Sequence, residues 1–254
     1  MNKAFIIDLE GTLVSNGIPL FGSVELIDTL NINNIPYCII TNTVSKTVGQ
    51  MEENLKINGL NVLEGHILNP ITVLDYFIKE NEIKSYYFVG PEYLKNLIRE
   101  SDVFEGIPDS IIFCDFENID FNYNILNKVF QYIKGGSKII TTSYSDYYIS
   151  KNEYKMDTGI FVKMYETLTN EKAEIMGKPS PMIYKMALNI LKVKSTNVIT
   201  IGDDVLTDIE GSKKIGMETV LVKTGKYKEG DEKKHKPNKT INNLTEIIKI
   251  INGK

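Results

Sequence analysis

The sequence predicts an α/β protein: a parallel sheet covered by helices, into which a second, smaller α/β domain is inserted. Short apolar runs alternate with longer amphipathic segments, which is typical of parallel strands joined by helices. Polar residues suited to chemistry follow the apolar runs near both ends of the chain, but not in its middle. We therefore assign residues 1–80 and 176–254 to the first domain and 81–175 to the insertion.

Composition narrows the class of protein. The 254 residues are 42% hydrophobic and 24% charged, with a net charge of −4, which is ordinary for a soluble globular protein. The acidic balance argues against a nucleic-acid partner, and no apolar run reaches the roughly 18 residues of a membrane span. Met1-Asn2-Lys3 leads into a strand without a signal-peptide pattern, so a cytoplasmic location is expected. Cys38 and Cys114 lie in apolar runs and are expected to be buried, reduced thiols.

The first domain begins with a strand ending at Asp8 and continues with a helix over 19–33, whose apolar residues recur at helical spacing. Ser45 is a good N-cap for a helix over 46–58, and Ser180 for a helix that starts at Pro181. The remaining strands predicted there are 36–41, 198–202 and 219–222, and 61–68 is predicted as a short strand with a loop. The remaining helices are predicted at 70–81, 206–214 and 244–251, and a loop at 225–238.

The insertion repeats the alternation of strand and helix. Its predicted elements are strands at 86–90, 110–115 and 138–141, and helices at 91–100, 123–134 and 159–168. The stretch 143–155 is polar and rich in tyrosine, and no strand is predicted for it.

Polar residues directly after apolar strands form the candidate site. They are Asp8 with Glu10, Thr41 with Asn42, Lys178, and Asp203 with Asp208. One parallel sheet places such residues at the same edge, where ligands of α/β proteins bind. Each alone is weak evidence, since polar residues after strands are mostly solvated turns. Their joint occurrence, in order, predicts a site.

This set fits phosphoryl transfer. The Asp8 carboxylate can attack phosphorus and form an acyl phosphate. Because substrate and nucleophile are both anionic, a cation must screen them, and carboxylates such as Asp8 and Asp203 suit Mg²⁺. The Lys178 ammonium and the Thr41 hydroxyl can bind phosphate oxygens. Asp208 could hold metal-bound water or Lys178, or simply compensate a helix dipole.

At this point the chain resembles the phosphatases of the haloacid dehalogenase (HAD) superfamily. The four motifs occur in order as Asp8-Leu-Glu-Gly-Thr12, Thr41-Asn42, Gly177-Lys178-Pro179, and Gly202-Asp203-Asp204 followed by Asp208. The position and size of the insertion resemble subfamily IIA, the NagD-like and 4-nitrophenylphosphatase-like group. The segment 221–227 resembles the one that follows the last core strand in this subfamily.

The resemblance implies a Rossmann-like core with a movable α/β cap of type C2, and a Mg²⁺ cofactor. It also implies residue roles. Asp8 would be the nucleophile, and Glu10 would be the general acid and base, with its backbone carbonyl bound to the metal. The phosphate ligands would be Thr41, Asn42 and Lys178. The metal site would be formed by Asp8, Glu10, Asp203 and Asp208.

Glu10 departs from the family pattern, which has Asp at this position. One extra methylene moves the carboxylate by about an ångström, and misplacement on that scale can cost roughly 10²-fold in rate. The backbone carbonyl is unaffected by the side chain. We hypothesise that Glu10 still serves as the general acid.

Cap residues of the insertion are candidates for substrate specificity: Tyr144, Asp146 and Asp157. Tyrosines can stack on a ring or bind a sugar by hydrogen bonds. Tyrosines could equally well pack in the core of the cap or in a homodimer interface. The sequence does not name the substrate.

The sequence thus predicts a Mg²⁺-dependent phosphatase of a small phosphorylated metabolite, such as a sugar phosphate, nucleotide or aryl phosphate. Neither nucleic acid nor membrane is expected as a partner, and a homodimer is left open. Two alternatives remain: a phosphotransferase or phosphomutase using the same intermediate, and a weakly catalytic regulatory protein that binds a phosphorylated ligand, prompted by Glu10.

Overall fold

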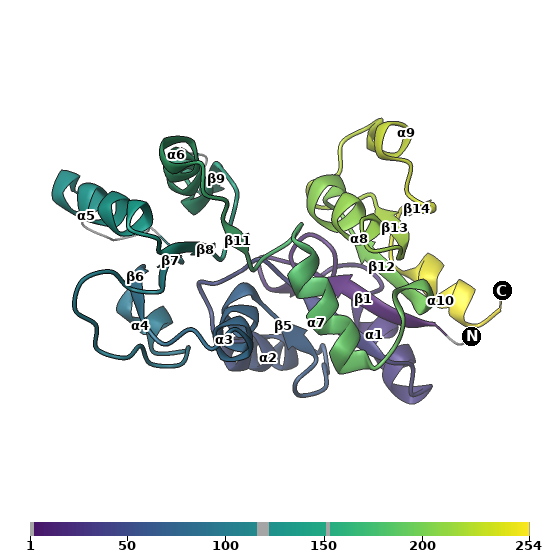
Figure 1. The fold of residues 1–254 in the computed structure, drawn as a ribbon. Coiled ribbons are helices and arrows are strands. Elements are labelled where there is room, and N and C mark those ends of the chain that lie inside the picture. Colours follow the sequence, from purple (N-terminus) through teal and green to yellow (C-terminus); the bar gives the residue numbers. More distant parts are fainter. Residues whose placement is uncertain (1–2, 116–121, 151–152, 254) are drawn as a thin grey trace. The chain divides into compact units, whose positions relative to one another are not determined.

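The computed structural model describes residues 3–115, 122–150 and 153–253 (Figure 1). The chain divides into two compact units. Unit 1 comprises Met1–Thr41, Ser45–Asn69 and Lys178–Lys254, and unit 2 comprises Asn42–Val44 and Pro70–Gly177. Helix α3 (Pro70–Glu80) therefore belongs to unit 2, whereas the predicted first segment, 1–80, included it.

Unit 1 is built on a parallel sheet with the strand order β14-β13-β12-β1-β4-β5. Its strands are β1 (Ala4–Asp8), β4 (Tyr37–Ile40), β5 (Ile67–Leu68), β12 (Val198–Gly202), β13 (Glu218–Val222) and β14 (Lys239–Ile241). Every residue of β1 is buried, because the strand lies inside the sheet and helices cover both faces.

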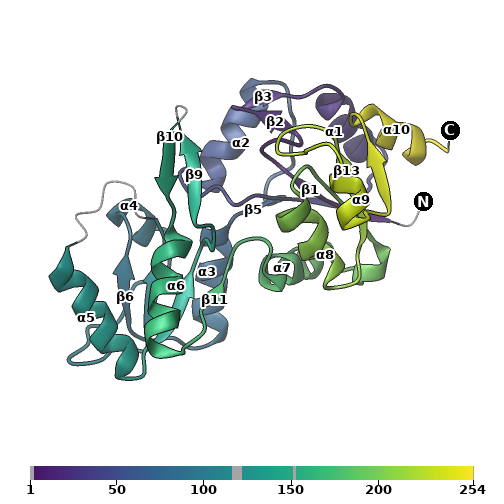
Figure 2. The same ribbon diagram turned by 90° about the horizontal axis from the view of Figure 1, so that it is seen from above.

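The helices of unit 1 lie on both faces of this sheet. They are α1 (Ser23–Ile32), α2 (Val48–Ile57), α7 (Pro181–Leu191), α8 (Glu210–Lys213), α9 (Asp231–His235) and α10 (Thr245–Ile251). Figure 2 shows α1, α2 and α10 on one side of β1 and α7 and α8 on the other. The first group of helices packs against the sheet in one apolar cluster, which includes Leu26 of α1, Leu55 of α2 and Ile247 of α10.

Unit 1 differs from the sequence prediction in several short elements, and the strand predicted over 61–68 is reduced to the two residues of β5. A short hairpin, β2 (Val14–Ser15) with β3 (Ile18–Pro19), precedes α1, so this helix starts later than predicted. The predicted loop 225–238 contains helix α9, and strand β14 follows it. Both are short and charged, and tertiary contacts rather than periodicity define them.

The N-cap of α2 is also corrected. The side chain of Thr47, not that of Ser45, accepts from the Gln50 backbone N–H, at 3.2 Å. The Gln50 side chain accepts in return from the Thr47 N–H, at 2.9 Å. This capping box satisfies two backbone donors reciprocally, which a cap at Ser45 would not do.

Unit 2 contains a second parallel sheet, with the order β11-β8-β7-β6. Its strands are β6 (Tyr86–Val89), β7 (Ser110–Phe113), β8 (Lys138–Thr141) and β11 (Glu174–Ile175). Helices α5 (Tyr123–Lys134) and α6 (Thr158–Thr169) cover one face, and α3 and α4 (Glu92–Lys95) the other (Figure 1). The predicted architecture, an α/β fold with an inserted α/β unit, is confirmed.

Two predictions for unit 2 need correction. The predicted helix over 91–100 is reduced to the four residues of α4. The tyrosine-rich stretch forms an antiparallel hairpin of β9 (Tyr147–Ser150) and β10 (Glu153–Met156), where no strand was predicted. Between its strands, the rings of Tyr147 and Tyr154 lie 5.4 Å apart. Within the described ranges, no helix combines the length and apolarity that crossing a membrane requires.

The capping box gives a prediction for stability. We expect Thr47→Ala to lower the free energy of unfolding by about 0.5–2 kcal/mol, because the Gln50 N–H loses its acceptor. Ser45→Ala is the matched control, since Ser45 is exposed and caps nothing, and its effect should stay within about 0.5 kcal/mol. Urea unfolding measures both. A larger loss for Ser45→Ala would contradict the assignment of the cap.

Candidate active site

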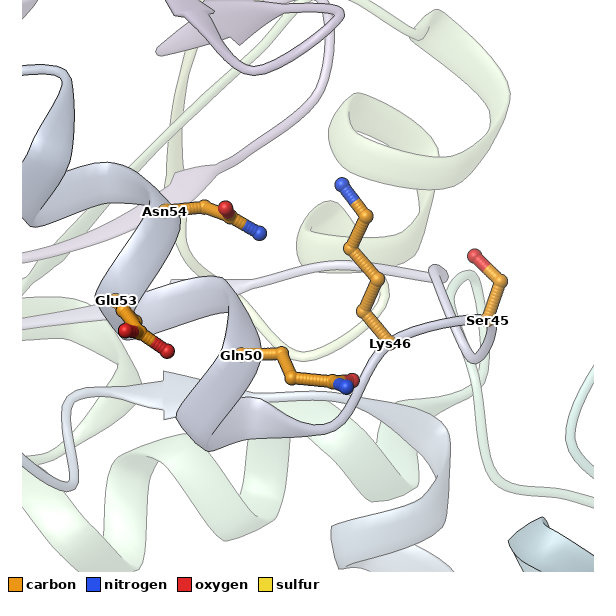
Figure 3. A pocket seen from close by; sticks show the side chains of 5 residues that line it. All are labelled: Ser45, Lys46, Gln50, Glu53 and Asn54. Atoms are coloured by element: carbon orange, nitrogen blue, oxygen red, sulfur yellow. The ribbon is translucent and has the colours of Figure 1, made fainter.

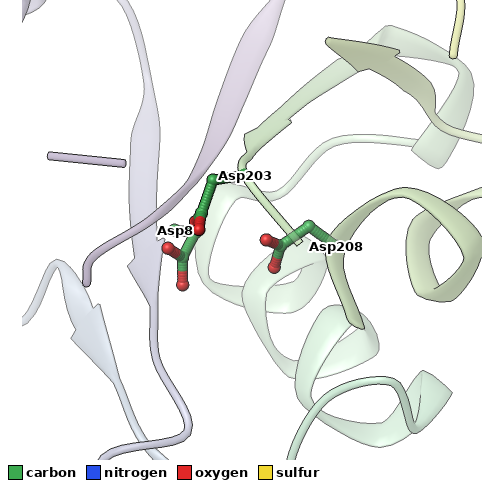
Figure 4. Close-up of side chains that lie close together, drawn as sticks. All are labelled: Asp8, Asp203 and Asp208. Carbon is green, nitrogen blue, oxygen red and sulfur yellow. The ribbon is translucent and has the colours of Figure 1, made fainter. Parts of the chain in front are cut away.

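Three buried carboxylates meet at the carboxyl edge of the unit 1 sheet (Figure 4). Asp8 is the last residue of β1, and Asp203 follows the last residue of the neighbouring strand β12. Asp8, Asp203 and Asp208 each offer a carboxylate oxygen within 4.8 Å of the other two. Thr41 is also buried at this edge, one residue beyond Ile40, the register partner of Asp8.

Asp208 reaches the cluster through an irregular turn. The predicted helix over 206–214 is instead a π-helical turn, Val205–Ile209, followed by α8. The Asp204 side chain caps this turn, and Asp208 Oδ2 accepts from the Asp204 N–H at 3.1 Å. A Cβ on Gly202 would lie 2.3 Å from the Asp208 side chain, so only glycine allows this approach. Such π-turns occur frequently at functional sites.

Lys178 bridges two of the acids. Its ammonium donates to Asp8 Oδ1 and, at 2.7 Å, to Asp208 Oδ1, and its side chain is 3% exposed. Burial by itself would lower the pKa of Lys178, but the charges of Asp208 and Asp8 raise it above its ordinary value. The lysine is therefore protonated and fixed between the two carboxylates.

The cluster carries an excess of negative charge. Burial raises the pKa of Asp8 to about 6 and that of Asp208 to about 7, although Lys178 opposes both shifts. Burial also raises the pKa of Asp203. Three carboxylates face one ammonium, so a divalent cation would balance the charge and keep the acids ionised.

An unpartnered oxygen supports a metal at this place. Asp8 Oδ2 is buried and has no hydrogen-bond partner within the described part of the chain. A buried acceptor left unsatisfied in this way costs free energy. Hard carboxylate oxygens are the donors that Mg²⁺ prefers. The residues present therefore fit a Mg²⁺ ion held by Asp8 and Asp203.

Asp203 is oriented by two donors that sequence reasoning did not assign. The Thr12 hydroxyl donates to Oδ1 at 2.9 Å, and the Lys226 backbone N–H donates to Oδ2 at 2.7 Å. Thr12 stands within the first motif, so its type and spacing could have indicated a role. The Lys226 contact uses the backbone and leaves no side-chain signal.

The Glu10 side chain is held apart from the cluster. It is exposed, and Glu10 Oε1 accepts from the Asn16 backbone N–H at 2.6 Å, in the turn of the β2–β3 hairpin. It is not among the three clustered acids. A metal contact through the Glu10 backbone carbonyl, as expected from the sequence, stays a prediction.

The candidate cap residues lie in unit 2 and are bonded around α6. The Tyr144 hydroxyl donates to Glu166 at 2.5 Å, and Asp146 accepts from Lys163 at 2.5 Å. Asp157 is the N-cap of α6 and accepts from the Thr158 N–H at 2.7 Å and the Ser143 hydroxyl at 3.1 Å. Burial and the bond to Glu166 raise the pKa of Tyr144 to about 12. Their role in substrate binding stays a prediction.

Asn42, predicted to bind phosphate beside Thr41, is likewise grouped with unit 2. A Cβ on Gly177 would lie 2.8 Å from Asn42 Oδ1, which explains the glycine there. The buried carboxylate Glu166 was missed in the sequence, because nothing in its spacing marks it as the partner of Tyr144.

A polar hollow of about 340 Å³ lies on unit 1 beside α2 (Figure 3). Its lining residues are Ser45, Lys46, Gln50, Glu53 and Asn54. None of them belongs to the cluster of acids, so we do not assign the reaction to this hollow.

Two family models match this chain, one in its N-terminal part and one in its C-terminal part. A model described as haloacid dehalogenase-like hydrolase matches residues 5–104, and a model described as HAD-hydrolase-like matches residues 175–247. Together they cover about two thirds of the chain and include every member of the acidic cluster and Lys178.

Two similar proteins extend over almost the whole chain. Haloacid dehalogenase-like hydrolase domain-containing protein 2 of Mus musculus is 28% identical over 239 residues, covering 92% of this chain and 89% of that protein. The phospholysine phosphohistidine inorganic pyrophosphate phosphatase of Xenopus laevis is 28% identical over 262 residues, covering 98% and 94%.

Solved structures share the fold. The 4-nitrophenylphosphatase of Thermotoga maritima superposes with a TM-score of 0.85 at 23% identity, covering 97% of this chain and 96% of that one. NagD from E. coli K-12 gives a TM-score of 0.83 at 24% identity, covering 96% and 97%. The predicted resemblance to this group is confirmed at the level of the fold.

The bridging lysine gives a second prediction. In EDTA at pH 8, we expect Lys178→Met to lower the free energy of unfolding by roughly 3–5 kcal/mol, because two buried carboxylates lose their counter-charge. Lys194→Met, at an exposed lysine, is the control. Urea unfolding measures both variants.

The loss should be smaller at pH 5.5 than at pH 8. Without Lys178, the folded-state pKa values of Asp8 and Asp208 rise further above their unfolded values. The folded variant then takes up protons as the pH falls, which restores stability. A loss that is equal at both pH values would show that the charges of these acids are not its cause.

Proposed function

This chain belongs to the haloacid dehalogenase-like hydrolases and is a phosphoric monoester hydrolase, and from this premise we propose that it is a Mg²⁺-dependent phosphatase of a small phosphorylated metabolite. Its substrate would be a sugar phosphate, nucleotide or aryl phosphate, and the reaction would pass through an aspartyl phosphate on Asp8. One observation carries the proposal: Asp8 Oδ2 is buried without a hydrogen-bond partner within the described residues, beside Lys178 and Asp203.

In the proposed reaction, Asp8 attacks phosphorus and the bond from phosphorus to the leaving oxygen breaks. The leaving oxygen takes a proton from Glu10. Water then attacks the aspartyl phosphate, gives a proton to Glu10, and releases inorganic phosphate and the Asp8 carboxylate. The charge of Lys178 opposes the rise in the pKa of Asp8 and so favours the ionised nucleophile.

The residues that would hold Mg²⁺ are Asp8, Asp203 and the backbone carbonyl of Glu10, with Asp208 supporting the site. When bound, the ion neutralises charge on the substrate phosphate and on the nucleophile. Thr12 and the Lys226 N–H fix the orientation of Asp203.

For the substrate phosphate, we assign Lys178 and Thr41 of unit 1 as ligands; the part of Asn42, which is grouped with unit 2, stays a prediction from the sequence. Lys178 is held in place by Asp208 and presents a charge beside the nucleophile. Thr41 is buried at the same sheet edge as Asp8. In this proposal both orient the phosphoryl group for in-line attack.

A second candidate is a protein that binds a phosphorylated ligand and turns it over slowly. It is favoured by Glu10, whose carboxylate is exposed and bonded to the Asn16 N–H. A general acid has to reach the leaving oxygen, and this hydrogen bond holds the carboxylate in the hairpin turn.

The names of the relatives widen the set of substrates to be tested. One of them is named as a phosphatase of phospholysine, phosphohistidine and inorganic pyrophosphate. A panel should therefore add phosphoramidates and pyrophosphate to metabolite phosphates. Product analysis with sugar acceptors separates a phosphatase from a phosphotransferase or phosphomutase, because only the latter forms a new phosphate ester.

The nucleophile is tested with Asp8→Asn on this panel, in Mg²⁺ and in EDTA. We expect phosphate release to fall by roughly 10³-fold or more in the variant, since no aspartyl phosphate can form. EDTA should abolish release by the wild type. Asp102→Asn, at an exposed acid, is the control. Release that persists in Asp8→Asn would overturn the mechanism.

Glu10 is tested by comparing Glu10→Gln with Glu10→Asp. Proton transfer by a positioned acid typically contributes about 10²–10⁴-fold, so Glu10→Gln should lose activity on that scale. Glu10→Asp retains a carboxylate and should keep more of it. Equal rates for wild type and Glu10→Gln, measured as kcat on the best substrate of the panel, would exclude Glu10 as the acid and favour the second candidate.

A further inference from the structure

The segment that follows β13, Thr224-Gly225-Lys226, contacts the site without contributing a clustered acid. The Lys226 backbone N–H donates to Asp203 Oδ2 at 2.7 Å. The Thr224 hydroxyl donates to the Gly11 carbonyl at 2.6 Å. The segment is therefore tied to two loops at once, the one after β1 and the one after β12.

Close packing fixes the Asp203 carboxylate between two glycines. A Cβ on Gly225 would lie 2.1 Å from Asp203 Oδ2 and 2.7 Å from the Gly11 Cα. A Cβ on Gly11 would lie 2.4 Å from the same carboxylate oxygen. Gly225 has a φ of +51°, a value that alanine can adopt at modest cost. The requirement for glycine at this position thus comes mainly from the contact with Asp203.

Together these contacts remove the rotational freedom of the carboxylate. Each Asp203 oxygen accepts one hydrogen bond, from the Thr12 hydroxyl or from the Lys226 N–H. A carboxylate has about four lone-pair sites, so each oxygen keeps one for a metal. Outer partners of this kind fix the orientation of metal ligands and are needed for full affinity.

We propose that Thr224, Gly225 and Lys226 are positioning residues, which hold Asp203 in the orientation that binds the divalent cation. The inference rests on the proposed function, which supplies the cation. The Lys226 side chain is not the donor: it is 74% exposed and its ammonium pairs with Asp204 at 3.0 Å, while the backbone N–H donates to Asp203.

The test compares Gly225→Ala with Gly230→Ala. Gly230 lies shortly after the segment and has a φ of +94°, but a Cβ there would meet nothing within 4 Å. The control therefore carries at least as much backbone strain without touching the site. The full-length proteins are titrated with MgCl₂ alone, and the rise in Tm with Mg²⁺ gives the apparent Kd.

We expect the apparent affinity for Mg²⁺ to fall by about 10–100-fold in Gly225→Ala, the usual effect of disturbing an outer partner. Gly230→Ala should bind Mg²⁺ as the wild type does. A role confined to folding would instead lower the Tm in EDTA and leave the Kd unchanged, and that result would overturn the inference.

Thr224→Val tests the same inference without a new contact at Asp203, and so stands even if Gly225→Ala does not fold. It keeps the side-chain shape and removes the bond to Gly11, so Mg²⁺ affinity should fall, and Thr224→Ser should restore it. Wild-type affinity in Thr224→Val would likewise refute the positioning role and leave the proposed function intact. Absence of Mg²⁺ binding by the wild type would refute both.

Discussion

The ammonium group of Lys178 joins two buried carboxylates, and the burial of the acidic cluster depends on that contact. Asp8 lies near the start of the chain, while Lys178 and Asp208 lie beyond the inserted unit. Three acids buried together would repel one another and would raise each other's pKa values. The lysine offsets part of this repulsion, and the negative charge that remains is the physical basis of the proposed divalent cation.

The backbone determines how close these groups come. β1 lies between β12 and β4 in a parallel sheet, so the residues that follow each strand emerge at one edge. Gly202 packs against the Asp208 side chain, and Gly11 and Gly225 pack against the Asp203 carboxylate. A Cβ atom at any of these three glycines would clash with the acid beside it. The site therefore requires glycine at these three positions as well as the acids themselves.

Unit 2 fixes its own candidate loop in a comparable way. The three cap residues that the sequence proposes for specificity are each bonded to a partner in or beside α6; they are Tyr144, Asp146 and Asp157. The segment before β9 is thereby tied to α6. Glu166, buried and bonded to both Tyr144 and the Ala173 N–H, anchors it.

The sequence by itself determined the α/β class and most of the long elements, because apolar periodicity is a local signal. It also pointed to the acids and Lys178 as one candidate site, because each directly follows an apolar strand. Its errors fall on short or irregular elements: the β2–β3 and β9–β10 hairpins, α9, and the π-turn before α8. Only the tertiary structure decided that Thr47 caps α2, that Glu10 is held by Asn16, and that the Lys226 backbone orients Asp203. Such contacts join backbone groups or residues distant in the chain, and therefore leave no pattern in the order of side chains.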